Sequence, residues 1–358
     1  MTSRERIIAA FYHQEPDRTP CFEYVLLSPV ADAVLGRHYE DFGGDMKAWF
    51  DYAEQLGGYE KAIQQYAVDR VELAQKLGHD MIYCVPNPPE NIFKKKPDDN
   101  PLTFNDPVEA IKWSNASSKE RLKEPLYDFI VYPLLREQMK KRDMDLPIYA
   151  PAFSHGIWTN TDLMQTLLLE PEIAHEHFLL CTEFTLRYID IYTELGVEII
   201  GVGGDFAGNR PLISPEMYRD FIMPELKKLT EIIRVKGKFS VNASDGNLWD
   251  VTDYFLLGSG VDGYGEIDAG AGMDLKKLKK QYGDRITFLG NIDCGNLLTF
   301  GTEEEIRATV RRCLEDGMGN GGHIFTASNA ITGSVSLQNY LYMVNEYRRF
   351  FGLSIICF

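Results

Sequence analysis

The stretch Val197-Glu198-Ile199-Ile200-Gly201-Val202-Gly203-Gly204-Asp205 decides the fold class of this 358-residue chain. Its nearly continuous apolar run is typical of a parallel strand that is buried on both faces of a sheet. Two glycines and a carboxylate follow the run directly, as expected where such a strand ends in a loop that carries function.

Similar short apolar segments recur on both sides of this stretch, and longer amphipathic segments separate them. Seven of them are predicted strands: Cys21–Leu26, Asp80–Cys84, Leu146–Ala150, Phe239–Asn242, Gly263–Ile267, Ile286–Leu289 and His323–Thr326. Together with Val197–Val202 they make eight strand–helix units, which predicts an α/β fold of the (β/α)8 TIM-barrel type. We expect residues 1–358 to form one barrel domain, with a helical elaboration over about residues 30–78 and a polar loop over 92–101.

Two helix starts can be read directly from the sequence. Thr2 and Glu5 form a capping box ahead of Ile7 and Phe11. Ser214-Pro215-Glu216 combines an N-cap residue, a first-turn proline and an acidic first turn, and so predicts a second helix start.

The charge balance excludes one class of partner. Asp and Glu number 53 against 37 Lys and Arg, a formal net charge of −16, which argues against binding to nucleic acid and to anionic membrane surfaces. The sequence contains neither a signal-peptide pattern nor a run of about 20 apolar residues. Its six cysteines are scattered, so we expect a cytoplasmic protein with reduced thiols.

Several common catalytic motifs are absent from the sequence. It has no G-x-S-x-G, no G-x-x-x-x-G-K-[ST] and no H-E-x-x-H. The glycines at 201, 203 and 204 lack the G-x-G-x-x-G spacing, since position 206 is Phe. A nicotinamide cofactor is therefore not supported.

The predicted active site lies at the carboxyl ends of the strands, as in other barrels of this type. The candidate catalytic residues there are Asp205, Asp245 and Glu266. The candidate substrate-binding residues are Tyr24, Tyr83, Asn87, Phe153, His155, Asn242, Asp268, Asp293 and Asn329.

Three of these residues also have a purely structural interpretation. Asp245 precedes a glycine and could cap the next helix, Asp293 could only fix its loop, and His155 could be a hydrogen-bonded structural residue. Because side chains alternate along a strand, we expect at most one of Glu266 and Asp268 to point inward.

Several stretches together resemble the uroporphyrinogen decarboxylase superfamily, and within it the branch that includes corrinoid-dependent methyltransferases. They are Met1–Arg6, Glu15–Pro20, Pro211–Tyr218, Ala271–Leu275, Gly283–Arg285, Gly290–Asp293 and Gly321–Ile324. The resemblance runs nearly end to end and implies a distorted (β/α)8 barrel, with a homodimer as the family's expectation.

The chain departs from the family where the functional residues stand. Family decarboxylases have an arginine-rich segment after the first strand and an aspartate after the second, and both are missing here. Zinc-dependent methyltransferases of the family carry histidine and cysteine ligands at the positions that hold Ala243, Asp245 and Asn329 in this chain. A soft-ligand zinc site is thus not expected; an all-oxygen site built from Asp205, Asp245, Glu266 and Asp268, or no metal at all, remains open.

The resemblance implies a methyltransferase that moves a methyl group from a small donor, such as a methyl ether or methylamine, to a cobalt corrinoid. A partner protein would carry the corrinoid, since this chain has no D-x-H-x-x-G segment. We expect Asp245 or Glu266 to act as proton donor or metal ligand, and Asp205 and Asn242 to orient the donor.

The apolar wall of this site would consist of Tyr24, Tyr83 and Phe153. Two alternatives stay open: a decarboxylase or lyase acting on a small carboxylic acid, and a non-catalytic ligand-binding barrel.

Overall fold

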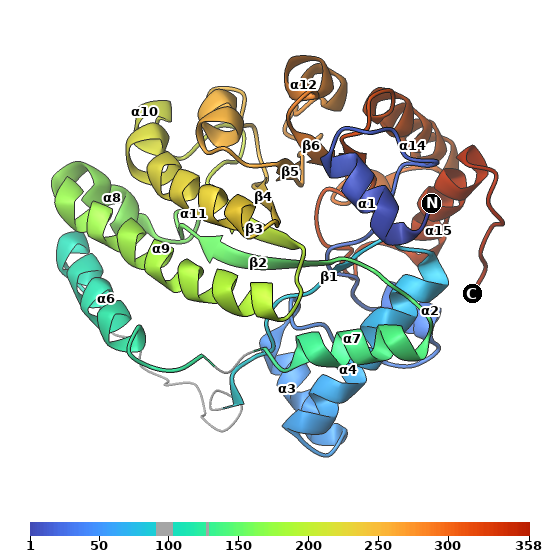
Figure 1. The fold of residues 1–358 in the computed structure, drawn as a ribbon, viewed down its shortest axis with the longest axis horizontal. Helices are drawn as coiled ribbons and strands as arrows, with labels where there is room; N and C mark the ends of the chain where they lie inside the picture. The colour runs from blue at the N-terminus through green and yellow to red at the C-terminus, as the bar shows by residue number, and fades with distance from the viewer. Residues whose placement is uncertain (91–102, 127–128) are drawn as a thin grey trace.

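The computed structural model describes residues 1–90, 103–126 and 129–358, so the loop predicted at 92–101 lies outside the described residues. Its centre is a seven-stranded, all-parallel sheet in the order β1 to β7, so that strands consecutive in the chain are neighbours in space (Figure 1). The strands are β1 Ile82–Tyr83, β2 Ile148–Ser154, β3 Ile199–Gly203, β4 Phe239–Ala243, β5 Gly263–Gly265, β6 Thr287–Leu289 and β7 His323–Ile324. Seven of the eight predicted strands are therefore present, although several are shorter than predicted.

The predicted first strand, Cys21–Leu26, is wrong as a regular strand. It makes only two isolated parallel bridges, from Cys21 to Phe325 and from Leu26 to Ile331, and the Cys21 carbonyl also accepts the backbone N–H of Asp80 at 2.7 Å. Between the bridges the Ala327 N–H donates to the side chain of Glu23 at 3.3 Å. A buried carboxylate thus accepts an N–H in place of a backbone carbonyl, and the segment connects β7 to β1 without forming a ladder.

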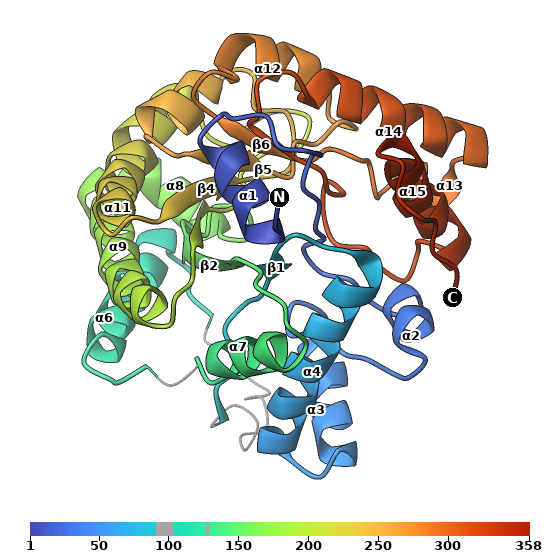
Figure 2. The same cartoon turned by 45° about the vertical axis from the view of Figure 1, so that its right-hand side comes forward.

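The helices surround the curled sheet (Figure 2). Up to β3 they are α1 Ser3–Phe11, α2 Val30–Leu35, α3 Met46–Gln55, α4 Tyr59–Leu77, α6 Pro107–Arg121, α7 Val131–Lys141, α8 Thr161–Leu169 and α9 Pro171–Glu194. After β3 come α10 Pro215–Met217, the π-helix η1 Tyr218–Ile222, α11 Met223–Val235, the π-helix η2 Asp253–Gly258, α12 Leu275–Tyr282, α13 Leu297–Phe300, α14 Glu303–Gly317 and α15 Leu337–Phe350. The segment 30–78 is helical as predicted, and its helix α4 packs against α7 and β1.

Both predicted helix starts are confirmed. The Thr2 side chain accepts the Glu5 N–H while the Glu5 carboxylate accepts the Thr2 N–H. The Ser214 hydroxyl accepts the Met217 N–H at 3.2 Å. The second helix, however, does not continue regularly, since η1 separates α10 from α11.

Helix α1 covers the end of the sheet where the strands begin. Its residues Ile7, Ala10 and Phe11 pack into the same buried cluster as side chains from the sheet interior, among them Tyr149 and Val241. The opposite end, where the strands finish, is left to the loops that carry the candidate residues. No helix among the described residues is long and apolar enough to cross a membrane, and all six cysteines are free thiols.

Candidate functional site

Three of the predicted residues come together at the carboxyl ends of neighbouring strands. Asp205, Asp245 and Glu266 follow β3, β4 and β5, and one carboxylate oxygen of each lies within 4.8 Å of the others. Consecutive parallel strands end side by side, which is why residues 21 to 61 positions apart in sequence meet here. We call these three residues the carboxyl cluster.

Asp245 is the best-connected member of the cluster. Its backbone N–H donates to Asp205 Oδ1 at 2.8 Å, and its own Oδ2 accepts the Asn329 side-chain amide at 2.6 Å. Burial and the charge of Asp205 raise the pKa of Asp245 to about 7, against the opposing effect of the Asn329 hydrogen bond. Asp245 is therefore neither a helix cap nor a fully ionised surface acid; its carboxyl group exchanges a proton near neutral pH.

Glu266 and Asp268 both reach the site, so the expectation that at most one would point inward is wrong. Residues two positions apart on a strand lie on the same face, so alternation does not separate these two side chains. Glu266 and Ile267 also have φ values of 79° and 44°, so the backbone leaves the extended conformation at the end of β5. Burial and the neighbouring carboxylates of Asp245 and Asp205 raise the pKa of Glu266 well above its usual value. Asp268 accepts the backbone N–H groups of Gly246 at 3.1 Å and Ala271 at 3.0 Å.

A cavity of about 550 Å³ opens beside the cluster, and we call it the mouth cavity. Four of the predicted residues line it: Asp245, Asp268, Asp293 and Asn329. The remaining lining residues are Gly208, Asn209, Gly270, Ala271, Cys294, Gly295, Asn296 and Ser328. The lining thus contains three carboxylates and, among the described residues, no lysine, arginine or histidine.

Three tyrosines lie in the interior near the cluster, and we call them the tyrosine floor. The ring centroids of Tyr24 and Tyr83 are 5.0 Å apart, those of Tyr83 and Tyr149 5.0 Å, and those of Tyr24 and Tyr149 5.8 Å. The negative charge of Glu266 is among the causes that raise the pKa of all three phenols. The tyrosine floor therefore lies within electrostatic range of the carboxyl cluster.

Two predicted site residues, Asn87 and Asn242, form hydrogen bonds to other elements of the fold. The Asn87 amide donates to the Tyr59 hydroxyl at 2.7 Å and its oxygen accepts the Val131 N–H at 3.1 Å. The Asn242 amide donates to the Tyr218 hydroxyl at 3.2 Å and to the Phe255 carbonyl at 3.1 Å. Neither residue lines the mouth cavity.

His155 and Phe153 are buried, and neither lines the mouth cavity. His155 is 1% exposed, accepts the Ile157 N–H at 3.3 Å, and lies beside the rings of Phe153 and Phe206. Burial lowers the pKa of His155 to about 4, so the imidazole is neutral. Its contacts match the structural interpretation, whereas Asp293 fixes its loop by accepting the Asn296 N–H and also lines the mouth cavity.

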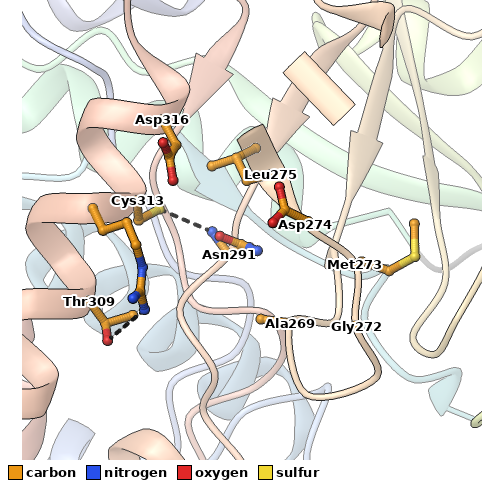
Figure 3. A pocket seen from close by; sticks show the side chains of 10 residues that line it. Ala269, Gly272, Met273, Asp274, Leu275, Asn291, Thr309, Cys313 and Asp316 are labelled. Atoms are coloured by element: carbon orange, nitrogen blue, oxygen red, sulfur yellow. Dashed lines mark hydrogen bonds between the residues drawn. The ribbon is translucent and has the colours of Figure 1, made fainter. Parts of the chain in front are cut away.

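A second cavity, of about 370 Å³, lies between α12 and α14 (Figure 3). Asn291, Cys313 and Asp316 line it, and the Cys313 sulfur accepts the Asn291 N–H at 3.4 Å. None of the predicted site residues lines this cavity.

The site contains residues that the sequence did not single out. Tyr149 lies within a predicted strand, and the sequence carries no further signal that its ring lies beside those of Tyr24 and Tyr83. Cys294 and Ser328 line the mouth cavity, with 3.6 Å between the Cys294 sulfur and the Ser328 hydroxyl. Burial raises the pKa of Cys294, which keeps it a thiol.

The residues present do not fit a histidine–cysteine zinc site. Ala243 offers no donor atom, and both polar atoms of the Asn329 side chain are occupied, the amide by Asp245 and the oxygen by the Ala330 N–H at 2.6 Å. The grouped ligand atoms at the cluster are carboxylate oxygens, which suit harder ions than zinc.

Comparison with known proteins agrees with this architecture. Residues 155–350 match the family model described as uroporphyrinogen decarboxylase (URO-D). The uroporphyrinogen decarboxylase of Chlorobium phaeovibrioides is 24% identical over 63% of this chain and 67% of its own length. That of Coxiella burnetii is 24% identical over 51% and 49%.

Two methyltransferases are also similar. A methylated-thiol–coenzyme M methyltransferase of Methanosarcina mazei is 25% identical over 62% of this chain and 59% of its own length. The solved structure of a methyltransferase from Methanosarcina mazei aligns with a TM-score of 0.69 at 16% identity, covering 98% of this chain and 99% of that one. The chain spans about half to two thirds of the curated relatives it matches. Since the family model covers more than half of the chain, the chain belongs to the uroporphyrinogen decarboxylase family.

Proposed function

We propose that this protein is a methyltransferase that moves a methyl group from a small donor to a cobalt corrinoid carried by a partner protein. The observation that carries the proposal is the carboxyl group of Asp245, held by Asp205 and Asn329 at the edge of the mouth cavity. The similarity to a methylated-thiol methyltransferase supports the reaction class.

Asp245 supplies what methyl transfer needs from a protein side chain. A methyl donor reacts only when the atom that loses the methyl group leaves as a stable species, and a positioned acid can protonate that atom. Because Asn329 donates to Oδ2 of Asp245, the proton of the neutral carboxyl group resides on Oδ1. With a pKa of about 7, Asp245 carries that proton in about half of the molecules at neutral pH.

The remaining cluster residues hold Asp245 in this state. Asp205 fixes the loop through the Asp245 N–H, and its negative charge together with that of Asp268 favours the protonated form of Asp245. The rings of the tyrosine floor pack edge-on against one another in the interior. The corrinoid acts as the second substrate and accepts the methyl group.

The mouth cavity disfavours the decarboxylation of a porphyrinogen. That substrate carries several carboxylates, which a protein binds with arginine or lysine. The described lining of the cavity contains Asp245, Asp268 and Asp293 and no cationic side chain, so a polyanion would be repelled.

The test uses the purified chain, free cob(I)alamin as methyl acceptor, and a panel of methyl ethers, methyl thioethers and methylated amines. Formation of methylcobalamin is followed by its visible absorption. We expect transfer from at least one donor, and a loss of about 100-fold or more in kcat/KM for Asp245→Asn. The control Asp250→Asn removes an exposed acid from the following turn and should leave the rate unchanged.

Two results would contradict the proposal. One is release of carbon dioxide from a small carboxylic acid without corrinoid; the other is methyl transfer that is equally fast in the Asp245→Asn variant.

A further inference from the structure

We propose that the mouth cavity binds a polyhydroxylated compound through its hydroxyl groups, and that the methyl donor is a methyl ether of such a compound. The second part rests on the proposed function, whereas the binding of hydroxyl groups is an independent claim. Its evidence is the chemical composition of the cavity lining, the polar groups that converge beside Gly270, and the hydrogen-bonding capacity that the chain leaves unused there.

The described lining of the mouth cavity is almost entirely polar. It consists of three aspartates, three asparagines, one serine and one cysteine, together with three glycines and one alanine. Small-molecule sites of this size are usually lined mainly by apolar side chains. Tyr24, Tyr83 and Phe153, which were expected to form an apolar wall, do not line the cavity. A ligand of the mouth cavity must therefore be held by hydrogen bonds rather than by apolar contact.

The same lining disfavours other classes of ligand. An aromatic ether or a quaternary ammonium group gains its binding energy from apolar and aromatic surfaces, and the described lining has no aromatic side chain. An anion needs arginine or lysine, which the described lining also lacks. A neutral compound with several hydroxyl groups is the class that remains.

Three polar groups converge on the space beside Gly270, which has no side chain to fill it. A Cβ on this residue would lie 3.2 Å from Asp268 Oδ1, 3.7 Å from Asp293 Oδ2 and 3.9 Å from the Asn296 amide nitrogen. Two hydrogen-bond acceptors and one donor thus border the same space. A hydroxyl group both donates and accepts, so it can use both kinds of partner at once.

Part of this hydrogen-bonding capacity is not used within the described chain. Asp293 accepts the Asn296 backbone N–H through Oδ1 at 2.9 Å, and neither Asp293 Oδ2 nor the Asn296 side-chain amide forms a hydrogen bond among the described residues. The side-chain amide of Asn209, in the same lining, forms none either. Asp245 uses Oδ2 for Asn329 and keeps Oδ1 available. The lining therefore offers partners for several hydroxyl groups of one ligand.

A divalent metal ion fits the space beside Gly270 less well. Asp268 already accepts the Gly246 N–H through Oδ2 at 3.1 Å and the Ala271 N–H through Oδ1 at 3.0 Å. Ca²⁺ takes six to eight oxygen ligands, and Asp293 offers only one carboxylate oxygen that is not engaged.

Asp245 connects the binding of hydroxyl groups to methyl transfer, because it lines the same cavity. In a methyl ether of a polyol the bond between the methyl carbon and the ether oxygen breaks, and the oxygen keeps the electron pair and takes a proton from Asp245. Both electrons of the new cobalt–carbon bond come from the reduced corrinoid, the second substrate of the proposed function. The products are the methylated corrinoid and the polyol with a free hydroxyl group, and Asp245 regains its proton from water.

The test measures binding to the full chain without corrinoid by ligand-observed NMR titration. The probes are myo-inositol, D-glucose and ribitol; cyclohexanol, which has the ring of inositol and a single hydroxyl group, is the matched comparison. We expect at least one polyol to bind at least about tenfold more tightly than cyclohexanol. Choline and Ca²⁺ complete the panel and should bind more weakly than that polyol.

Two variants locate the binding. Asn296→Ala removes one hydrogen-bond donor and should weaken polyol binding at least about threefold. Gly270→Ala places a methyl group among the three polar groups and should weaken it at least as much. The control Asn105→Ala removes an exposed asparagine outside the cavity and should leave polyol binding unchanged.

The inference is overturned if no polyol binds, if cyclohexanol, choline or Ca²⁺ binds as tightly as the best polyol, or if both cavity variants bind that polyol as the unmodified chain does. Thermal melting of each variant shows whether a loss of binding reflects unfolding. If Gly270→Ala unfolds, Asn296→Ala decides.

Methyl-transfer assays separate this inference from the proposed function. Selective binding of a polyol without methyl transfer from any donor would uphold the binding site and refute the function. Transfer from aromatic ethers or methylated amines, but not from methyl ethers of the polyols, would uphold the function and refute this donor.

Discussion

The side-chain amide of Asn329 donates a 2.6 Å hydrogen bond to Oδ2 of Asp245, although the two residues lie 84 positions apart and follow different strands. The bond stabilises the ionised form of Asp245, while burial and the charge of Asp205 stabilise the neutral form. The protonation state of Asp245 at neutral pH therefore depends on a residue from the loop that follows β7.

Replacing Asn329 with leucine should raise the pKa of Asp245 above about 7, because this variant loses the side-chain hydrogen bond that favours the carboxylate. The pH above which Asp245 is ionised then moves upward, by roughly one unit if the bond is worth about 1.4 kcal/mol. Carboxyl-carbon NMR titration or the alkaline limb of kcat/KM against pH measures the shift. The control Asn209→Leu alters another residue of the mouth cavity and should leave the titration in place; a downward shift for Asn329→Leu would contradict the assignment.

The carboxyl cluster should cost stability at alkaline pH. The pKa values of Asp245 and Glu266 are raised in the folded protein. The stabilisation that comes from protonating these two groups is therefore fully present below their unfolded-state pKa, and it is lost as pH rises through the folded-state pKa. Asp245→Asn should therefore raise the free energy of unfolding by about 1 to 3 kcal/mol at about pH 8 and have little effect at about pH 4. Urea unfolding at both pH values tests this, and a stabilisation that is equal at the two pH values would argue against it.

The strands could be predicted from the sequence where their signal is local. The runs that became β3 to β7 are dense in apolar residues and need no partner to be recognised, and the acids that follow them meet because parallel strands end together. Cys21–Leu26 carries the same local signal, but part of its backbone pairing is replaced by hydrogen bonds to the Glu23 side chain. The donors, Thr326 and Ala327, lie 303 and 304 positions away, so no local pattern predicts these bonds.

The same limit applies to individual site residues. Asn87 and Asn242 follow predicted strands just as Asp205 does, yet their amides are used by Tyr59 and Tyr218 on other elements. The expectation that at most one of Glu266 and Asp268 points inward fails because residues two positions apart on a strand share a face. The positive φ values of Glu266 and Ile267 could not be predicted either, since neither residue type favours them.

Glu23 should be a neutral, structural acid. Burial raises its pKa to about 8, although the Thr326 hydroxyl donates to Oε2 at 3.2 Å and the Ala327 N–H donates at 3.3 Å. Glu23→Gln keeps an acceptor for both donors and should change the free energy of unfolding by less than about 1 kcal/mol at neutral pH, whereas Glu23→Ala strands them and should cost about 1 to 3 kcal/mol. Denaturant unfolding of the pair is the measurement, and equal losses in both variants would show that the charge of Glu23 matters instead.

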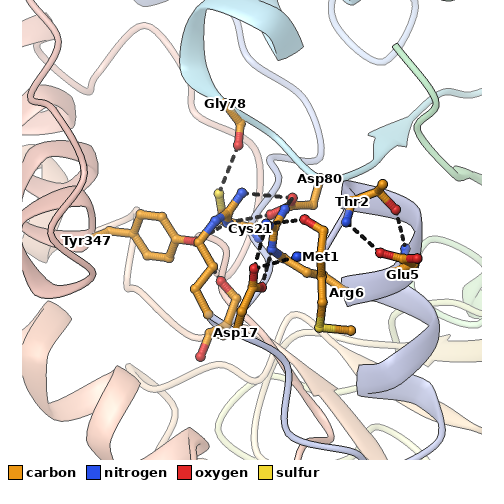
Figure 4. A network of polar contacts seen from close by, with 11 residues as sticks. Met1, Thr2, Glu5, Arg6, Asp17, Cys21, Gly78, Asp80 and Tyr347 are labelled. Atoms are coloured by element: carbon orange, nitrogen blue, oxygen red, sulfur yellow. Dashed lines mark hydrogen bonds and ion pairs between the residues drawn. The ribbon is translucent and has the colours of Figure 1, made fainter.

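Asp80 lies at the centre of a network of ion pairs, and its substitution should strongly lower the free energy of unfolding (Figure 4). It is fully buried and accepts the Arg18 guanidinium at 2.6 and 2.9 Å, Arg6 at 3.2 Å and the Cys21 N–H at 3.0 Å. Arg18 also donates to the Tyr347 hydroxyl, so the group joins α1, the segment before β1 and α15.

Asp80→Asn leaves a partly buried arginine pair without its counter-charge and should cost about 3 to 5 kcal/mol in the free energy of unfolding. The control Asp284→Asn removes an acid that is 75% exposed and 3.7 Å from Arg285, and should cost less than about 0.5 kcal/mol. Urea unfolding compares the two variants. If Asp80→Asn costs no more than the control, the network does not hold the N-terminal segment against the sheet, and that segment is held instead by its backbone bridges to Phe325 and Ile331 and by the hydrogen bonds of Glu23.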